Sequence, residues 1–259
     1  MAVEIDLTGH RALVTGGGQG VGEGIALLLA QAGAEVVVND IVAERAQGVV
    51  DQIEAAGGRG IAAPFDLTDL DAVKAGFEAF GGGIDILVNN AGNAGSEGVG
   101  ARGFFWELDT ARWDAYIKIN LYAVMHTVHV AVPDMIEKGW GRLITVVSDA
   151  GRVGDAQGAV YSGAKAGAAG FMRSIAREAG RYGITANNIS LGTMNVATTA
   201  QSWTDLTTPH AKAMMKQYIV RRPGLPSDVA AMALYLASEQ SEWVTGQTYP
   251  VNGGFSLAQ

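Results

Sequence analysis

The sequence predicts an α/β protein of three layers, in which a doubly wound parallel sheet of seven strands carries helices on both faces. First, short apolar runs alternate along the chain with longer stretches of helical periodicity, and repeated strand–helix units give parallel strands joined by right-handed crossovers. Second, some runs, such as residues 36–38, are apolar throughout, as strands covered on both faces should be. Third, a glycine-rich turn at residues 16–22 separates the first strand from the first helix.

Each predicted element rests on its own local pattern. The strands are short apolar runs that end at polar or glycine residues, namely residues 12–14, 36–38, 61–63, 84–88, 143–147, 184–190 and 247–251. The helices repeat apolar residues at helical spacing, namely residues 25–30, 43–56, 69–80, 110–138, 158–182 and 227–238. Gly33 and Gly57 end the first two helices, because glycine accepts the left-handed conformation that follows a helix. Thr68 is the predicted N-cap of the third helix.

Two segments between these elements have no regular periodicity. Residues 93–106 form a glycine-rich loop that ends in aromatic residues, and residues 193–222 form a long loop with some helix. No repeat, linker or block of charge divides the chain. We therefore expect residues 1–259 to form one domain, with residues 193–222 as a lid.

The composition excludes several classes of function. The 259 residues include 18 basic and 26 acidic side chains, a net charge of −8, whereas a nucleic-acid-binding surface needs clustered positive charge. The chain contains no cysteine, which excludes a disulfide scaffold, thiol catalysis and cysteine-ligated metal. Its 36 glycines have no collagen-like period, so we expect them to serve particular turns and contacts.

No segment predicts export or membrane insertion. Residues 1–11 contain Glu4 and Asp6 and no apolar core, unlike a signal peptide. The longest apolar region, residues 117–136, is interrupted by charged residues such as Lys118, so it is too broken to span a bilayer. We expect a cytoplasmic protein that binds neither a membrane nor a nucleic acid.

The glycine-rich turn has the pattern Thr-Gly-x-x-x-Gly-x-Gly, formed by Thr15, Gly16, Gly20 and Gly22. A phosphate at this point would meet free backbone N–H groups and the positive end of the helix dipole. Glycine lets the backbone approach the phosphate with no Cβ in the way. Neither the strict Gly-x-Gly-x-x-Gly spacing nor the Walker pattern occurs here. The turn alone therefore leaves two alternatives open, a nucleotide site and a simple tight turn.

Asp40 favours the nucleotide alternative and a Rossmann-type fold. It ends the second strand, 20 residues after Gly20, where a carboxylate can accept hydrogen bonds from both ribose hydroxyls of NAD. The same charge would repel the 2′-phosphate of NADP, and no basic residue directly follows Asp40. We therefore expect NAD rather than NADP, although Asp40 could also serve as the N-cap of the next helix.

A second group of polar residues lies at the ends of later elements. Tyr161 and Lys165 are four residues apart, on one face of a helix. Ser148 ends the fifth strand, and Asn120 lies in the long helix that enters the same region. A tyrosine with a pKa of about 10 costs about 4 kcal/mol to ionise at neutral pH. A cation ~4 Å away stabilises the ionised form by about the same amount. A tyrosine beside such a cation can therefore exchange a proton with a substrate oxygen. Each residue also has a structural alternative. Tyr161 and Lys165 could be an ordinary surface pair, Ser148 could cap the end of a strand, and Asn120 could be a satisfied buried amide.

With these motifs in place, the chain resembles the single-domain branch of the short-chain dehydrogenase/reductase family over essentially its whole length. The motifs that carry the resemblance follow the order and spacing of the family, namely Thr15-Gly16…Gly20-Val21-Gly22, Asp66-Leu67, Asn89-Asn90-Ala91-Gly92, Asn120, Ser148, Tyr161-x-x-x-Lys165 and Thr245-Gly246-Gln247…Val251-Asn252-Gly253-Gly254. Within the family, the chain is similar to β-ketoacyl thioester reductases and to hydroxyacyl and cyclic-alcohol dehydrogenases.

The resemblance implies an enzyme that interconverts a secondary alcohol and a ketone with NAD. It implies that Tyr161 is the acid/base and that Lys165 lowers the pKa of Tyr161 and holds the nicotinamide ribose. It further implies that Ser148 binds the substrate oxygen and that Asn120 holds a water of the proton relay. The residues implied to bind the cofactor are Gly16, Gln19, Gly20, Val21, Gly22, Asp40, Asp66, Leu67, Asn89, Ala91, Gly92, Tyr161, Lys165, Gly192, Thr193 and Met194. The alternative is a non-catalytic NAD(H)-binding sensor or scaffold on the same fold.

The chain departs from the family pattern after the sixth strand. Leu191 replaces the family's usual proline, and Val196 stands where the family has a threonine that contacts the nicotinamide amide. Thr193 or Thr198 could substitute for that threonine. The aromatic run of residues 104–106 ends a loop longer than is usual in the family, and we expect it to pack or to form a subunit contact rather than to line a substrate mouth.

The histidines and Ser148 do not indicate a metal site or a hydrolase. His126 and His129 lie on a mostly apolar helix with no carboxylate at ligand spacing, and neither they nor His210 predict a metal site. Ser148 lacks the Gly-x-Ser-x-Gly elbow of the hydrolases.

The lid predicts a sizeable small-molecule substrate of apolar character. Its apolar residues, which could also pack on the core, are Met194, Trp203, Leu206, Met214, Met215, Tyr218 and Ile219. The basic residues at its far end, which permit an anionic handle such as a CoA thioester, are Lys212, Lys216, Arg221 and Arg222.

The helix after Tyr161 is rich in glycine and alanine over residues 163–170. Small residues let two helices pack closely, and members of the family pair this helix and the preceding long one across a twofold axis. We therefore expect a homotetramer or a homodimer. The alternative is that the same face packs only on its own sheet.

Overall fold

The computed structural model describes residues 5–92, 103–197 and 207–257. Its centre is a sheet of seven strands in which every pairing is parallel. The strands are β1 (Arg11–Val14), β2 (Glu35–Val38), β3 (Arg59–Ala62), β4 (Ile86–Asn89), β5 (Gly141–Ser148), β6 (Ile184–Leu191) and β7 (Thr248–Val251). Their order across the sheet is β3-β2-β1-β4-β5-β6-β7. The predicted doubly wound parallel sheet is confirmed.

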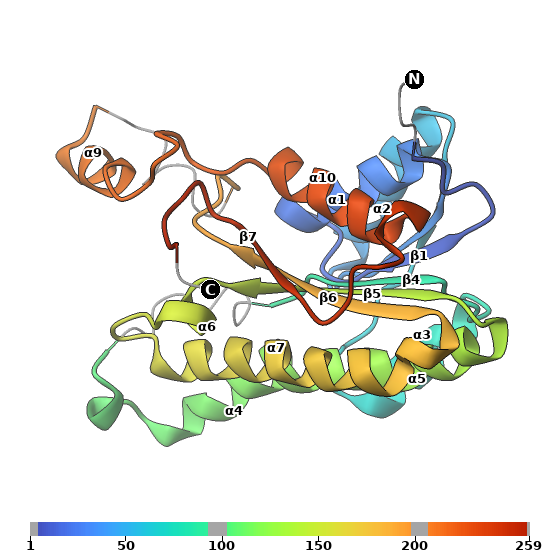
Figure 1. Ribbon diagram of the computed structural model, residues 1–259, viewed down its shortest axis with the longest axis horizontal. Coiled ribbons are helices and arrows are strands. Elements are labelled where there is room, and N and C mark those ends of the chain that lie inside the picture. The colour runs from blue at the N-terminus through green and yellow to red at the C-terminus, as the bar shows by residue number, and fades with distance from the viewer. Residues whose placement is uncertain (1–4, 93–102, 198–206, 258–259) are drawn as a thin grey trace.

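Helices cover both faces of the sheet, which completes the three predicted layers (Figure 1). One layer holds α1 (Gly20–Gln31), α2 (Ala43–Ala55) and α10 (Pro226–Ala237). The other holds α3 (Leu70–Ala79), α5 (Ala123–Lys138) and α7 (Ala159–Ala179). The shorter helices are α4 (Trp113–Ile117), α6 (Ala150–Val153) and α9 (Pro209–Met215), and single turns occur at η2 (Phe105–Glu107), η3 (Thr110–Arg112), η4 (Lys118–Tyr122), η5 (Gly180–Tyr182) and η6 (Glu239–Ser241).

Successive strand residues serve opposite cores, because side chains alternate between the two faces of a sheet. Val14 and Val88 are buried in the core beneath α1 and α10. Their neighbours Leu13 and Leu87 are buried in the core beneath α5 and α7. Strands covered in this way bury side chains on both faces, which explains continuous apolar runs such as residues 36–38.

The two glycine-containing motifs meet where the order of the strands reverses. β1 pairs with β2 on one side and with β4 on the other. In an open α/β sheet, ligands bind at the carboxyl ends of the strands beside such a switch point. Thr15 directly follows β1 and Asn90 directly follows β4, so the fold brings both motifs to one crevice.

The prediction that Thr68 caps the third helix is wrong. The N-cap of α3 is Asp69, whose carboxylate accepts hydrogen bonds from the backbone N–H groups of Asp71 and Ala72. Thr68 instead donates its hydroxyl to Asp66 at 2.8 Å, and its backbone N–H donates to the same Asp66 oxygen. An aspartate accepts at least as well as a threonine at this position, so the cap lies one residue later.

The helix predicted over residues 110–138 is divided into η3, α4, η4 and α5. Its η4 segment is a π-helix of five residues, a wider turn that inserts one residue into a helix. Similarly, the helix predicted over residues 158–182 ends as α7 at Ala179 and continues as the single turn η5. None of the described helices is long and apolar enough to cross a membrane.

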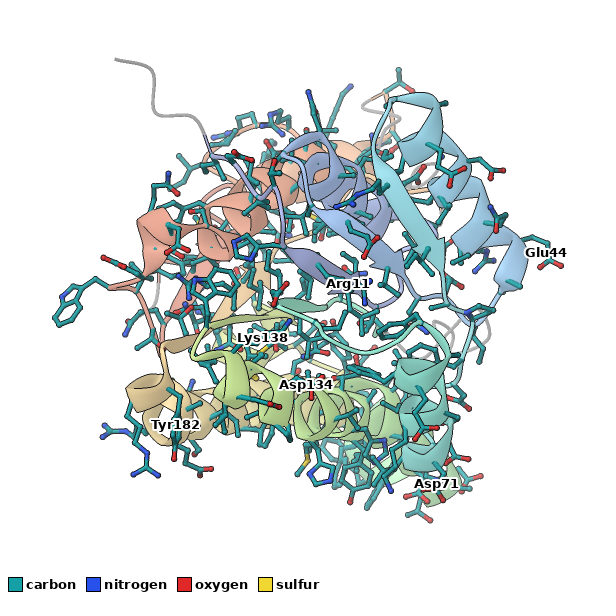
Figure 2. All side chains as sticks on the ribbon, turned by 90° about the vertical axis from the view of Figure 1, so that its right-hand side faces the viewer. Arg11, Glu44, Asp71, Asp134, Lys138 and Tyr182 are labelled. Carbon is teal, nitrogen blue, oxygen red and sulfur yellow. The ribbon has the colours of Figure 1, made fainter. Side chains whose placement is uncertain are left out.

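The amino ends of the strands form a polar edge of their own. Asp85, just before β4, accepts a hydrogen bond from Lys138 Nζ at 2.5 Å and one from the backbone N–H of Arg11 at 2.8 Å. The Arg11 side chain also pairs with Glu35. Figure 2 shows Arg11 and Lys138 on this side of the molecule. This edge lies opposite the carboxyl ends that carry the candidate site.

Candidate active site

The glycine loop is shaped so that its backbone can approach a ligand closely. Gly16 and Gly20 have φ angles of 58° and 60°, which favour glycine. Gly22 lies in the first turn of α1, where a Cβ would stand only 2.2 Å from the carbonyl oxygen of Gly16 and 2.5 Å from Asn90 Nδ2. The loop therefore packs tightly against the start of α1, and backbone N–H groups at a helix start are groups that can bind a phosphate.

Thr15 and Asn90 lock this loop to the end of β4. The Thr15 hydroxyl accepts hydrogen bonds from the backbone N–H groups of Asn90 and Ala91 at 3.0 and 3.1 Å. Asn90 Nδ2 donates to the carbonyl oxygens of Thr15 and Gly16, both at 3.0 Å. Asn90 stands in the motif Asn89-Asn90-Ala91-Gly92 but is not among the residues expected to bind the cofactor. Its side-chain amide, placed between residues expected to bind the cofactor, is the feature of the sequence that could have indicated that it holds the loop.

Asp40 is buried at the carboxyl end of β2, and its carboxylate lies beside the glycine loop. One oxygen accepts a hydrogen bond from the backbone N–H of Val42 at 3.0 Å. The other lies 2.7 Å from the position that a Cβ on Gly18 would occupy, and Arg45 Cβ lies 2.6 Å from the same position. The N-cap of α2 is Val42, so the alternative role of Asp40 as the helix cap is wrong.

Asn89 and Leu67 line a narrow cavity next to the loop, together with Thr15 and Ala91. Asn89 Oδ1 accepts a hydrogen bond from the Thr127 hydroxyl at 2.6 Å. Asn89 Nδ2 is buried with no partner within the described part of the chain. Such an orphaned donor is expensive unless a ligand or water satisfies it.

His126 supports the segment that carries Leu67. Its Nδ1 lies 2.9 Å from the carbonyl oxygen of Leu67, and since a carbonyl can only accept, this nitrogen donates. Among the described residues, no cluster of histidines and carboxylates could hold a metal ion. The contact gives His126 a structural role in the half-buried position it occupies.

Lys165 and Asn120 converge at Gly92. A Cβ on Gly92 would lie 2.8 Å from both Lys165 Nζ and Asn120 Oδ1, so only glycine leaves room for the two groups. Lys165 Nζ donates to the carbonyl oxygen of Val146 at 3.0 Å. Burial, which disfavours the charged ammonium, lowers the pKa of Lys165 to about 8.

The π-helical turn η4 places Asn120 at this point. Asn120 is fully buried, and its Nδ2 donates to the carbonyl oxygen of Tyr116 at 3.0 Å. That bond occupies the amide nitrogen, while Oδ1 lies on the side of Gly92, as Lys165 Nζ does. π-Turns inside α-helices frequently occur at functional sites.

Ser148 and Tyr161 lie on the two elements that Lys165 connects, β5 and α7. Ser148 is the last residue of β5, two residues after Val146, and its hydroxyl accepts a hydrogen bond from the backbone N–H of Ala150 at 3.2 Å. Tyr161 lies in the first turn of α7, one helical turn before Lys165. Gly151 of α6 lets these elements pack closely, since a Cβ there would lie 3.0 Å from the Lys165 backbone.

The start of the lid lies over the glycine loop. The backbone N–H of Thr193 donates to the Tyr218 hydroxyl at 2.9 Å, while Met194 is buried and forms a bridge with Gly224. Val196 Cγ1 lies 3.1 Å from the position of a Cβ on Gly20. Thr198, Trp203 and Leu206 lie outside the described residues.

These features fit a dinucleotide, because a close glycine approach, a carboxylate at the end of β2 and a buried unpaired amide lie along one crevice. The lysine and the asparagine at its far end provide polar groups where a reacting carbon and oxygen could be held.

Comparisons with known proteins give the same result. A family model described as enoyl-(acyl carrier protein) reductase matches residues 16–256. The (2S)-((R)-hydroxy(phenyl)methyl)succinyl-CoA dehydrogenase subunit BbsD of Thauera aromatica is 38% identical over 250 residues, which cover 95% of this chain and 96% of that protein. The 7α-hydroxysteroid dehydrogenase of Escherichia coli K12 is 34% identical over 252 residues, which cover 96% of this chain and 94% of that protein.

Two solved structures are similar over their whole length. The gluconate 5-dehydrogenase of Burkholderia cenocepacia, in complex with NADP and tartrate, has a TM-score of 0.89 and 30% identity, and the match covers 99% of this chain and 98% of that one. A 7α-hydroxysteroid dehydrogenase in complex with NADH and 7-oxo glycochenodeoxycholic acid has a TM-score of 0.86 and 32% identity, and the match covers 98% of each chain. On the strength of these matches, the chain belongs to the short-chain dehydrogenase/reductase family of oxidoreductases, which use NAD or NADP.

Proposed function

We propose that this chain is an NAD(H)-dependent oxidoreductase that interconverts a secondary alcohol and a ketone, with Tyr161 as acid/base. The observation that carries the proposal is that Lys165 Nζ and Asn120 Oδ1 both lie next to Gly92. Lys165 belongs to the same helix as Tyr161, and its ammonium bonds to the strand that ends at Ser148. A buried lysine whose described partner is a carbonyl rather than a carboxylate is costly for stability. This cost is understandable if the charge of Lys165 stabilises the ionised form of Tyr161.

In the oxidative direction, Tyr161 accepts the proton of the substrate hydroxyl. The Lys165 ammonium stabilises the phenolate that makes this transfer possible. Ser148 donates a hydrogen bond to the substrate oxygen and orients it. Asn120 holds the water through which the proton leaves. When bound, NAD supplies the acceptor for the hydride that leaves the alcohol carbon.

Asp40 supports NAD rather than NADP as the cofactor. It is 6% exposed and lies at the end of β2, where the carboxylate would accept from the ribose hydroxyls and repel a 2′-phosphate. Solved relatives contain either NADP or NADH. The preference therefore depends on the residues of this chain.

The lid supports a sizeable apolar or acyl-CoA substrate. Within the lid, Met215 and Tyr218 are buried, whereas Lys212, Lys216 and Arg221 are exposed. Arg222 pairs with Asp228 through two contacts of 2.6 and 2.8 Å, so its charge is already engaged. Three exposed cations remain that could meet an anionic handle, and one relative is named for a CoA thioester.

Replacing Tyr161 by phenylalanine tests the role of this residue. We expect Tyr161→Phe to lower turnover by on the order of a thousandfold, because the ring remains but the exchangeable proton is lost. NADH binding, measured by fluorescence, should be retained. Tyr182→Phe, at the far end of the same helical segment, is the matched control and should keep full activity. Retained turnover in Tyr161→Phe would contradict the assignment.

A substrate panel tests the specificity. Acyl-CoA, steroid and simple cyclic alcohols are offered with NAD, and the appearance of NADH is followed. We expect turnover of the larger apolar alcohols or of the CoA thioesters. If only small, uncharged alcohols react, the CoA part of the proposal fails.

A further inference from the structure

The Asp149 side chain, next to Ser148 in the chain, is a hub of four hydrogen bonds. It is 2% exposed. One carboxylate oxygen accepts from the Ser190 hydroxyl at 2.6 Å and from Arg152 NH1 at 3.0 Å. The other accepts from Asn252 Nδ2 at 2.5 Å and from the Ser256 hydroxyl at 3.0 Å. All four donors are therefore held by one buried group.

These donors come from three separate parts of the fold. Ser190 belongs to β6, Arg152 to α6, and Asn252 and Ser256 to the segment after β7. The backbone N–H of Asp149 also donates to the carbonyl oxygen of Leu191 at 3.0 Å. In Figure 1 this last segment runs back to the side of the molecule that carries α6. Asp149 thus ties the segment of residues 252–256 to the end of the strand that carries Ser148.

Arg152 reinforces the same attachment. Its NH1 donates to Asp149 and also to the Ser256 hydroxyl at 3.2 Å. Charge-assisted hydrogen bonds are roughly twice as strong as neutral ones, and removing one partner from a buried ionic cluster is strongly destabilising. The segment after β7 is therefore held mainly by one carboxylate and one guanidinium.

The anchored segment in turn holds the end of the lid. The backbone N–H of Val220 donates to the carbonyl oxygen of Gly253 at 2.9 Å. The rings of Tyr218 and Phe255 lie 5.3 Å apart. A Cβ on Gly254 would lie 2.8 Å from Ile219 Cβ, so the two backbones are in close contact.

The chain of contacts ends at a residue of the candidate cofactor site. Tyr218, which is 4% exposed, accepts a hydrogen bond from the backbone N–H of Thr193 through its hydroxyl. Gly192 is packed between Asn252 and Tyr218, since a Cβ there would lie 3.1 Å from an atom of each. The two ends of the lid are thus braced by the segment that Asp149 anchors.

We propose that Asp149 is a positioning residue for substrate binding. By holding residues 252–256, its carboxylate keeps the lid end at residues 218–220 closed against Thr193. This inference rests on the proposed dehydrogenase function for its kinetic consequence, whereas its structural consequence is measurable without turnover.

The test compares Asp149→Asn with Ser256→Ala and a matched control. Asparagine keeps the shape, but it replaces one acceptor oxygen by a donor, which leaves one pair of donors facing an N–H group. Ser256→Ala removes one bond of the hub and preserves the buried charge pair, so it remains informative if Asp149→Asn folds poorly. Asp85→Asn is the control, because Asp85 is also a buried, ion-paired aspartate but lies at the opposite edge of the sheet.

Two readouts separate positioning from general stability. In Asp149→Asn we expect amide hydrogen exchange at Val220 and Thr193 to accelerate by on the order of tenfold. We expect the KM of the alcohol to rise about fivefold with kcat changed less than about twofold. Ser256→Ala should show the same pattern with smaller changes, and Asp85→Asn should show neither.

The outcomes distinguish this inference from the proposed function. Unchanged exchange at Val220 in both hub variants would overturn the inference, as would an equal effect in Asp85→Asn. A fall in kcat alone, with exchange unchanged, would mean that Asp149 acts on Ser148 rather than on the lid, and would also overturn it. Faster exchange in a chain whose wild type oxidises no alcohol would support the anchoring role and refute the proposed function instead.

Discussion

Lys165 illustrates how one residue can bring stability and activity into conflict. It is 5% exposed and its pKa falls to about 8 because burial disfavours the ammonium. Between this value and the ordinary 10.5, the unfolded chain binds more protons than the folded one. The free energy of unfolding therefore rises with pH across that window, and the charged lysine costs stability below it.

Substitution of Lys165 by methionine should remove this dependence. A depressed pKa of this size corresponds to about 3 kcal/mol. Between about pH 8 and pH 10.5, the free energy of unfolding of wild type should therefore rise by on the order of that amount relative to that of Lys165→Met. Urea unfolding of both proteins across this pH range measures the difference between their free energies of unfolding. The contributions of the other titrating groups are the same in both proteins and cancel in this difference. Turnover should fall on the order of a thousandfold in the variant. Parallel stability profiles would show that Lys165 is not a buried cation.

Asp40 should determine the choice between NAD and NADP. We expect Asp40→Ala to lower kcat/KM with NAD and to raise it with NADP, so that the ratio changes on the order of a hundredfold, because both ribose recognition and phosphate repulsion depend on this carboxylate. Steady-state kinetics with each cofactor measures the ratio. Glu44→Gln, which removes an exposed charge from the first turn of α2, is the control. Comparable efficiency of wild type with both cofactors would refute the assignment.

At the scale of elements, the glycine loop depends on one close contact. Gly22→Ala would place a Cβ 2.2 Å from the carbonyl oxygen of Gly16, so the loop must move to accommodate it. We expect a lower Tm and NADH binding weakened more than about tenfold. Gly48→Ala in α2 is the control, since its Cβ would meet nothing within 4 Å and alanine favours a helix by up to about 1 kcal/mol. Wild-type binding in Gly22→Ala would contradict the proposed phosphate site.

Local sequence patterns predicted most of the elements, for a physical reason. Residues 36–38 and 184–190 are buried on both sides, so their composition is dictated by the sheet, and both form strands within one residue of the predicted bounds. The cap at Asp69 was missed because Thr68 and Asp69 are both good N-caps, and local sequence alone does not choose between them. The π-turn at Asn120 was missed because it spans only five residues, too short a stretch for a phase shift in the apolar periodicity to be recognised.

The candidate site was predictable where a residue type is scarce and its spacing is specific. Tyr161 and Lys165 stand one turn apart on α7 as predicted, and Asn120 meets the lysine. The loop-holding role of Asn90 and the role of Asp149 were missed because their partners are distant in sequence. Asn252 lies 103 residues after Asp149, and local periodicity contains no trace of such a contact. The aromatic run of residues 104–106 is 46–77% exposed, and its predicted subunit contact stays a prediction.

For the whole molecule, we propose that the small residues of α7 serve the assembly of several copies. A Cβ on Gly163 would meet nothing within 4 Å, and one on Gly170 would meet only the guanidinium of Arg173 at 3.6 Å. The fold of one subunit therefore does not require glycine at these positions, although glycine costs helix stability. A second copy packed against this face would explain both residues.

Sedimentation tests this proposal. We expect wild type to sediment as a tetramer or dimer at micromolar concentration, and Gly170→Leu to shift toward smaller species without loss of helical signal in circular dichroism. A Cβ at position 170 would meet only the Arg173 guanidinium, so with the helical signal retained we would assign a loss of assembly to the contact between subunits. A monomeric wild type would contradict the proposal.

The attachment of residues 252–256 also affects how the protein can be handled. Leu257, the last described residue, directly follows Ser256, which is bonded to Asp149 and Arg152 beside the candidate site. At the other end of the chain, the backbone N–H of Leu7 donates to Ala32 just after α1, on the amino side of the sheet. The described chain therefore reaches Ser256 beside the candidate site and starts near Leu7 on the opposite side of the sheet, so we expect a tag or linker joined at the amino end to lie farther from the candidate site than one joined at the carboxyl end.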